Sequence, residues 1–158
     1  MLNLGRAELQ RGDRARAAVL LDEGLELARE VGDTWSTSVA LAALGRLALE
    51  EGERARAGEL LGEALVLCRQ RGDRKIAAEC LDDLADAAAG EGEPARAARL
   101  AGAAAALREA IGVAGGSDER LAAVRAALDE TGFEAEWAAG RSLGLDDAIG
   151  YALARAGP

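Results

Sequence analysis

Apolar residues recur every three or four positions along most of the chain, which is the spacing of one face of an α-helix. Between residues 34 and 73 this pattern runs twice, on either side of Gly52. It predicts one helix over about 35–50 and a second over about 54–71. The apolar positions are Leu41, Leu44, Ala48, Ala57, Leu60, Leu61, Ala64 and Cys68. Glycines in the left-handed conformation end many helices, and Gly32, Gly52 and Gly72 suit that role.

The same pattern returns after 40 residues. Residues 4–33 and 44–73 are identical at 17 of 30 positions. A fainter third copy keeps Gly92, Ala95, Arg96, Ala97, Leu100, Ala104 and Gly112. Because neither helix of such a pair can bury its apolar face alone, a repeat of this kind indicates stacked helix pairs. We expect about two and a half repeats over 1–112, divided as 1–33, 34–73 and 74–112.

The remaining residues, 113–158, predict a cap of short helices over the end of the stack. One helix is expected from Asp118 to Glu130, with Gly132 as its stop. A second would carry Phe133 and Trp137 and end at Gly140. The last would begin near two carboxylates, Asp146 and Asp147, which favour the positive end of a helix. Three of the four aromatic residues lie in this part, as Phe133, Trp137 and Tyr151. They predict an apolar plug, and an aromatic ligand pocket is the alternative.

Composition and charge narrow the class of protein. Half of the residues are apolar, alanine dominates and β-branched residues are scarce, which favours an all-α fold. The formal net charge of −9 is spread along the chain and argues against direct binding of nucleic acid. The repeated arginines alternate with acidic residues and predict a solvated helix face rather than a phosphate-binding stripe. They are Arg14, Arg16, Arg54, Arg56, Arg96 and Arg99. With no signal-like start and no long apolar run, we expect a cytoplasmic protein without membrane contact.

The side chains of most enzyme active sites are missing. There is no histidine, which removes the usual general base and the commonest metal ligand. Cys68 and Cys80 either face each other across a helical turn or, as we favour, are small buried hydrophobes. The glycine cluster over residues 112–116 lacks the context of a phosphate loop and predicts a linker. We therefore expect no enzyme, no cofactor and no metal.

The spacing within each copy resembles a known repeat. Leu41-x-x-Leu44-Gly45-x-x-Ala48, followed by Ala57-x-x-x-Leu61-x-x-Ala64, resembles the tetratricopeptide consensus. The consensus aromatics are replaced here by leucine or alanine, and the period is 40 instead of about 34. This longer form is similar to repeats in the C-terminal regions of bacterial signal-transduction ATPases and of maltose-regulator-like and LuxR-type transcriptional activators. Residues 97–112 resemble the last repeat helix of those regions, and residues 133–149 resemble their closing segment. The resemblance implies an all-α helical-repeat solenoid with a C-terminal helical cap, and it transfers no catalytic residue.

The resemblance also implies where a partner would bind, because the first helices of tetratricopeptide repeats line a concave groove. By register that groove would hold Arg6, Arg46 and Asp86. Beside them would lie Asn3, Val39, Ala42, Glu79, Asp82 and Asp83. The family's clamps for a peptide carboxylate use basic and amide side chains where this third copy has acids, so such a clamp is not expected. A groove of mixed charge suits a helix or peptide of mixed charge, whereas mutual neutralisation of Arg46 and Asp86 is the alternative.

These observations favour a non-catalytic module that binds a protein, a peptide or a small effector. The resemblance implies the C-terminal part of a bacterial transcriptional regulator or signalling ATPase. The alternative is a free-standing adaptor that assembles other proteins. The first helix begins only about three residues before Leu4, and its counterpart in the second copy is longer. This favours a fragment of a longer regulator over an independent chain whose first helix pair offers an open face to a partner.

Overall fold

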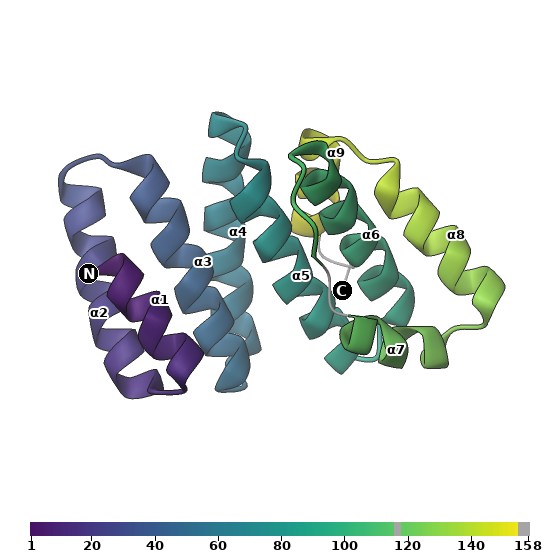
Figure 1. The fold of residues 1–158 in the computed structure, drawn as a ribbon, viewed down its shortest axis with the longest axis horizontal. Coiled ribbons are helices and arrows are strands. Elements are labelled where there is room, and N and C mark those ends of the chain that lie inside the picture. Colours follow the sequence, from purple (N-terminus) through teal and green to yellow (C-terminus); the bar gives the residue numbers. More distant parts are fainter. Residues whose placement is uncertain (116–117, 155–158) are drawn as a thin grey trace. The chain divides into compact units, whose positions relative to one another are not determined.

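The computed structural model describes residues 1–115 and 118–154. Over these residues the chain forms nine α-helices and no strand (Figure 1). In order they are α1 (Leu2–Arg11), α2 (Arg14–Glu30), α3 (Thr34–Glu50), α4 (Arg54–Arg71), α5 (Arg74–Gly90), α6 (Pro94–Ala110), α7 (Asp118–Ala127), α8 (Glu130–Arg141) and α9 (Leu145–Leu153). The all-α prediction is confirmed. The predicted linker reaches Gly116, which lies outside the described residues.

The helices belong to two compact units. The first comprises Met1–Cys68 and holds α1, α2, α3 and most of α4. The second begins at Arg69 and holds α5 to α9. The helices of the third sequence copy therefore share their unit with the helices of the tail. The division into repeats over 1–112 and a cap over 113–158 stays a prediction.

One turn geometry is used six times, at intervals of 20 residues. The glycines that end these helices have φ values between 68° and 85°: Gly12, Gly32, Gly52, Gly72, Gly92 and Gly112. At the turn after α2, the N–H of Gly32 donates a hydrogen bond to the carbonyl of Arg29 at 3.2 Å. The N–H of Asp33 donates one to the carbonyl of Ala28 at 2.9 Å. The Asp33 carboxylate then accepts the N–H groups of Trp35 and Ser36 at the start of α3. A Gly-Asp pair thus ends one helix and caps the next, as the sequence predicted for Gly32.

Replacing Gly52 by alanine is expected to lower the unfolding free energy by about 1–2 kcal/mol, because an L-residue is strained at this positive φ. A Cβ at Gly52 would meet no atom within 4 Å, so the loss comes from the backbone alone. Urea unfolding followed by circular dichroism measures it. Gly52→Asn is the matched control and should lose less, since asparagine tolerates the left-handed region. Equal stability of Gly52→Ala and the parent would contradict the turn geometry.

The first unit packs each first helix closely on its second helix. Gly5 on α1 lies against Leu21 on α2, and Gly45 on α3 lies against Leu61 on α4. A Cβ at Gly45 would sit 2.6 Å from Leu61 Cγ, so glycine allows a large side chain to fill the space between the helices. Leu21 and Leu61 are fully buried, as is Leu41. A glycine therefore allows this close packing in both copies.

In the second unit, α5 and α6 form a pair, and helices of the tail cover it. α8 packs on α6, and α9 contacts both α5 and α6. Phe133 of α8 and Ile149 of α9 are fully buried. Phe133 stacks on Trp137 with ring centroids 5.8 Å apart. The tail thus contributes Phe133 and Ile149 to the core of this unit.

Two glycines of the tail differ from their predicted roles. Gly132 does not stop a helix: α7 ends at Ala127, and Gly132 lies in the first turn of α8, where its N–H bonds the Asp129 cap. Gly140 does not end α8 either, because the helix continues to Arg141. Gly140 is buried where α8 crosses α6, and the absence of a side chain lets the two backbones meet.

Candidate functional site

The six residues predicted to line a groove are divided between the two units. Arg6 lies on α1 and Arg46 on α3, both half-buried, within the first unit. Four acids lie together on α5 of the second unit: Glu79, Asp82, Asp83 and Asp86. All six take part in polar or electrostatic contacts within the protein. A shared groove stays a prediction, and so does the neutralisation of Arg46 by Asp86.

The four acids of α5 have different surroundings. Asp83 is only 4% exposed. Asp82 forms an ion pair with Arg108 of α6, whose guanidinium also reaches the carbonyl of Gly115 at 3.5 Å. This half-buried pair links the two helices of the third copy and gives Asp82 a structural role. Glu79 and Asp86 lie one turn to either side and remain partly exposed.

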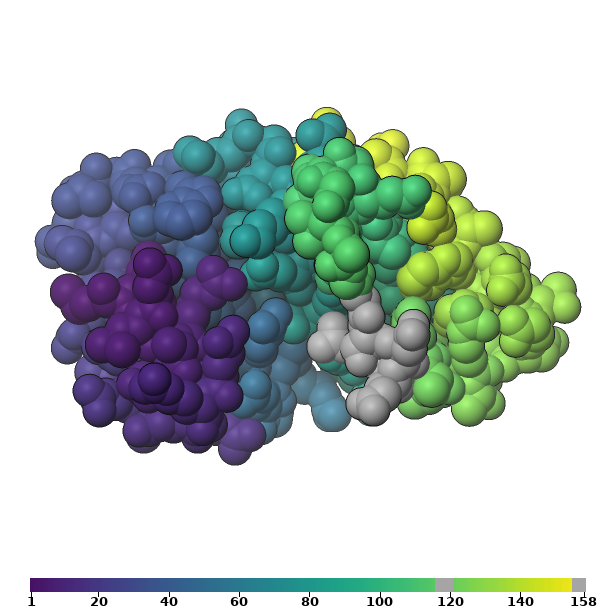
Figure 2. Space-filling view, viewed as in Figure 1, coloured from purple at the N-terminus to yellow at the C-terminus, as the bar shows by residue number. Residues whose placement is uncertain are grey.

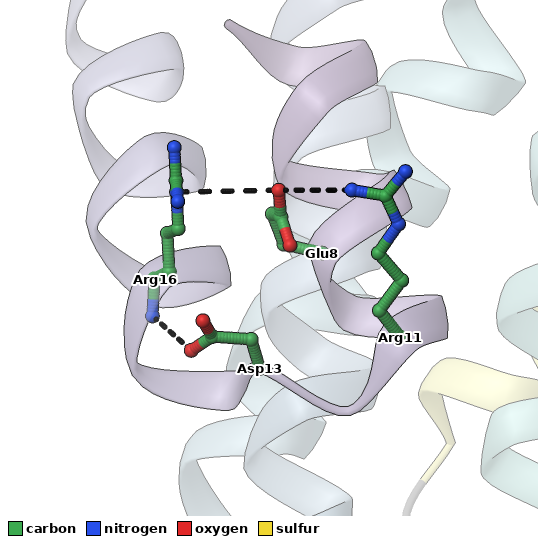
Figure 3. A network of polar contacts seen from close by, with 4 residues as sticks. All are labelled: Glu8, Arg11, Asp13 and Arg16. Atoms are coloured by element: carbon green, nitrogen blue, oxygen red, sulfur yellow. Dashed lines mark hydrogen bonds and ion pairs between the residues drawn. The ribbon is translucent and has the colours of Figure 1, made fainter.

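A second polar cluster closes the turn between α1 and α2. The Glu8 side chain is nearly buried, with one oxygen 3.5 Å from Arg11 Nη1 and 4.0 Å from Arg16 Nε (Figure 3). Asp13 accepts the backbone N–H of Arg16 at 3.1 Å. Two guanidinium groups thus compensate one carboxylate, and the geometry stabilises the turn. Sequence reasoning missed this cluster, although its signal was a glutamate where the other copies have Ala48 and Ala88.

The repeated arginines do not share one environment. Arg14, Arg16, Arg54 and Arg56 are exposed, as predicted for a solvated face. Arg56 donates a hydrogen bond to the Glu53 carboxylate at 2.9 Å, and this contact raises the pKa of the guanidinium.

For Arg96 and Arg99 the solvated-face prediction was wrong, because α8 and α9 cover α6. Arg96 donates to the carbonyls of Ala152 and Ala154 at the end of α9, at 2.9 and 3.1 Å. Arg99 bonds Glu136 of α8 at 2.7 Å. Both guanidinium groups lie within 5.3 Å of the centre of the Tyr151 ring. The third copy therefore uses these arginines to hold the tail.

Arg96→Ala is expected to lower the unfolding free energy by about 1.5–3 kcal/mol, since charge-assisted bonds to the carbonyls that end α9 are lost. Arg56→Ala is the matched control, because Arg56 occupies the same repeat position and is exposed. It should change the stability by less than about 0.5 kcal/mol. Guanidinium chloride unfolding of both variants tests the difference. Equal losses would show that the contacts of Arg96 with α9 contribute nothing to stability.

An open cavity of about 330 Å³ lies within the first unit, at the start of α1. This helix lies at the surface and is coloured purple in the space-filling view (Figure 2). Three segments supply the wall of the cavity: Met1, Leu2 and Asn3; Gly24, Leu27, Ala28 and Val31; and Asp33, Trp35 and Ser36. Sequence reasoning did not find this cavity.

No family model, curated protein or solved structure matches this chain. The likeness to tetratricopeptide repeats therefore stays a resemblance carried by the spacing of the residues. Among residues 1–115 and 118–154, no helix is both long enough and apolar enough to cross a membrane. The same described residues hold no cluster of three or more side chains suited to a metal ion.

Proposed function

We propose that this chain is a non-catalytic interaction module that binds a protein, a peptide or a small effector through the faces of its paired helices. The observation that carries the proposal is the regular turn geometry, with left-handed glycines every 20 residues between the helices from α1 to α6. Proteins built from such repeated helix pairs present extended surfaces for binding. The resemblance adds the context of a cytoplasmic bacterial transcriptional regulator or signalling ATPase.

Charge supports this proposal within the second unit. The acids of α5 occur at positions i, i+3, i+4 and i+7, so they lie on one face of the helix. Two of them, Asp82 and Asp83, are engaged in the α5–α6 pair or buried. We propose that a partner contacts Glu79 and Asp86, which are partly exposed. An acidic helix face of this kind attracts a partner with complementary basic residues and speeds its association.

Site-specific crosslinking tests the proposal. A photoreactive amino acid is placed at Glu79 of the full chain in its native cells, and the matched control carries it at Glu59, an exposed position on α4. We expect a discrete adduct at position 79 that is absent at position 59, and mass spectrometry identifies it. A protein or peptide adduct and a small-molecule adduct would both fit the proposed module, and they distinguish its two modes.

Charge reversal then tests, with purified components, whether the crosslinked partner binds this face of α5. Glu79→Lys combined with Asp86→Lys should weaken its binding at least about tenfold, which corresponds to about 1.4 kcal/mol. Glu59→Lys should leave the affinity within about twofold. Unchanged binding by the α5 double variant would refute the assignment of this helix face, and turnover of the bound molecule would refute the non-catalytic role.

A further inference from the structure

The tail packs unevenly on the third helix pair. α8 and α9 contribute fully buried side chains, whereas Val124 alone is buried among residues 121–127 of α7. Arg125 of α7 lies over the Phe133 ring and pairs with Glu130 at 3.2 Å, in a contact at the surface. α7 nevertheless contacts α5 as well as α6 and α8 (Figure 1). It is therefore held by a small apolar contact, which is typical of elements that open locally.

The residues before α7 lie beside the acids of α5. Arg108 of α6 forms an ion pair with Asp82 of α5, and it also donates a hydrogen bond to the carbonyl of Gly115 at 3.5 Å. The side chains of Arg108 and Asp82 are only 14% and 13% exposed. Along the helix Asp82 lies between Glu79 and Asp86. The segment that leads toward α7 is therefore tied to the middle of the acidic face of α5.

This ion pair occupies positions that are apolar in the second copy. Asp82 and Arg108 stand where that copy has Ala42 and Cys68, which are both buried. A permanently covered site favours apolar side chains, because the pairing of two charges only partly offsets their removal from water. A site that is covered at some times and exposed at others favours charged side chains, since they are hydrated again whenever it opens. The exchange of two apolar residues for an ion pair therefore indicates that the segment above it is removable.

We propose that α7 and residues 113–115 form a removable cover, which competes with a basic partner for the acidic face of α5. In the closed form Arg108 pairs with Asp82 and holds Gly115. In the open form α7 leaves α5 and α6, and basic side chains of the partner reach the acidic face. The inference rests on the proposed function, because it adds a regulatory contact to the same surface of α5.

Native-state hydrogen exchange of the full chain tests the cover in the absence of any partner. We expect the hydrogen-bonded amides of α7 to be at least about tenfold less protected than those of α8, because α7 opens while α8 stays packed. Val124→Ser should lower the protection of α7 at least about fivefold further and leave α8 unchanged. The matched control is Ala123→Ser, which places the same side chain at an exposed position of the same helix. Equal protection of α7 and α8, or equal effects of the two variants, would overturn the inference.

A peptide titration tests the competition. The probe is a fluorescein-labelled, alanine-based helical peptide with arginines at positions i, i+3, i+4 and i+7, which complement the acids of α5. The Val124→Ser variant should bind this peptide at least about fivefold more tightly than the parent chain, since a larger fraction of its molecules is open. The Ala123→Ser variant should bind it like the parent. Adding Glu79→Lys and Asp86→Lys to Val124→Ser should remove the gain in affinity.

The two measurements separate the inference from the proposed function. If Val124→Ser opens α7 but binds the peptide no more tightly than the parent, the cover does not compete and the inference fails. The proposed contact of a partner with α5 is then still decided by crosslinking at position 79. If the gain in affinity survives the charge reversal at Glu79 and Asp86, the peptide binds elsewhere, and the inference fails together with the assignment of the α5 face.

Discussion

Replacing Gly140 by alanine is expected to detach α8 from α6 and to lower the unfolding free energy by about 3 kcal/mol or more. A Cβ at Gly140 would point at the carbonyl oxygen of Arg99, only 2.9 Å from its carbonyl carbon and 3.0 Å from the backbone nitrogen of Ala103. These atoms belong to the α6 backbone and cannot move aside as a flexible side chain would. The two helices must separate to admit the methyl group, and Phe133 and Trp137 would then lose part of their packing.

Urea unfolding with tryptophan fluorescence measures this loss. Gly150→Ala is the matched control, because a Cβ there meets no atom within 4 Å and Gly150 lies inside α9. It should raise the stability by about 0.5–1 kcal/mol, since alanine favours the helix more than glycine does. Gly102→Ala, on the opposite side of the same crossing, should resemble Gly140→Ala, because its Cβ would lie 3.2 Å from the carbonyl carbon of Trp137. An unchanged unfolding free energy in the Gly140→Ala variant would contradict the close crossing of α6 and α8.

The sequence alone predicts which glycines end helices only where a repeat supports the prediction. Gly32, Gly52 and Gly72 follow apolar stripes that recur in another copy, and all three adopt positive φ. Gly132 and Gly140 occur in the tail, where no repeat indicates where a helix ends. There Asp129 caps α8, which begins at Glu130, three positions before Phe133, and a contact with α6 selects glycine at position 140. Such a contact joins residues far apart in the chain, so the local pattern cannot reveal it.

The same limit applies to the charged residues. Arg56 and Arg96 occupy equivalent positions, yet one is exposed and the other holds the end of α9. The difference comes from the tail and not from the local sequence of α6. The face shared by the acids of α5 follows from helical spacing, whereas the burial of Asp83 and the pairing of Asp82 with Arg108 depend on how α5 packs. Spacing predicts the face, and packing decides which of its members are buried.

Leu61→Ala is expected to lower the unfolding free energy by about 2–5 kcal/mol, because it empties a fully buried site. Gly45→Ala alone should lower it by about 1–3 kcal/mol, since the new methyl group collides with Leu61. The third copy shows how the two changes fit together. It has Ala85 where the second copy has Gly45, and Ala101 where the second copy has Leu61, and both alanines are buried.

The loss of unfolding free energy in the double variant should therefore be smaller than the sum of the losses in the two single variants, by about 1–3 kcal/mol. The alanine methyl at position 45 enters space that Leu61 has left, so it no longer collides and it fills part of the cavity. Chemical denaturation of the parent, both single variants and the double variant gives the coupling. Gly45→Ala combined with Leu21→Ala is the control, because Leu21 packs on Gly5, and these changes should add within about 0.5 kcal/mol. Additivity of Gly45→Ala and Leu61→Ala would mean that the two helices do not compensate in volume. In that case, the packing of a first helix on its second would not explain why the third copy has Ala85 and Ala101 in place of Gly45 and Leu61.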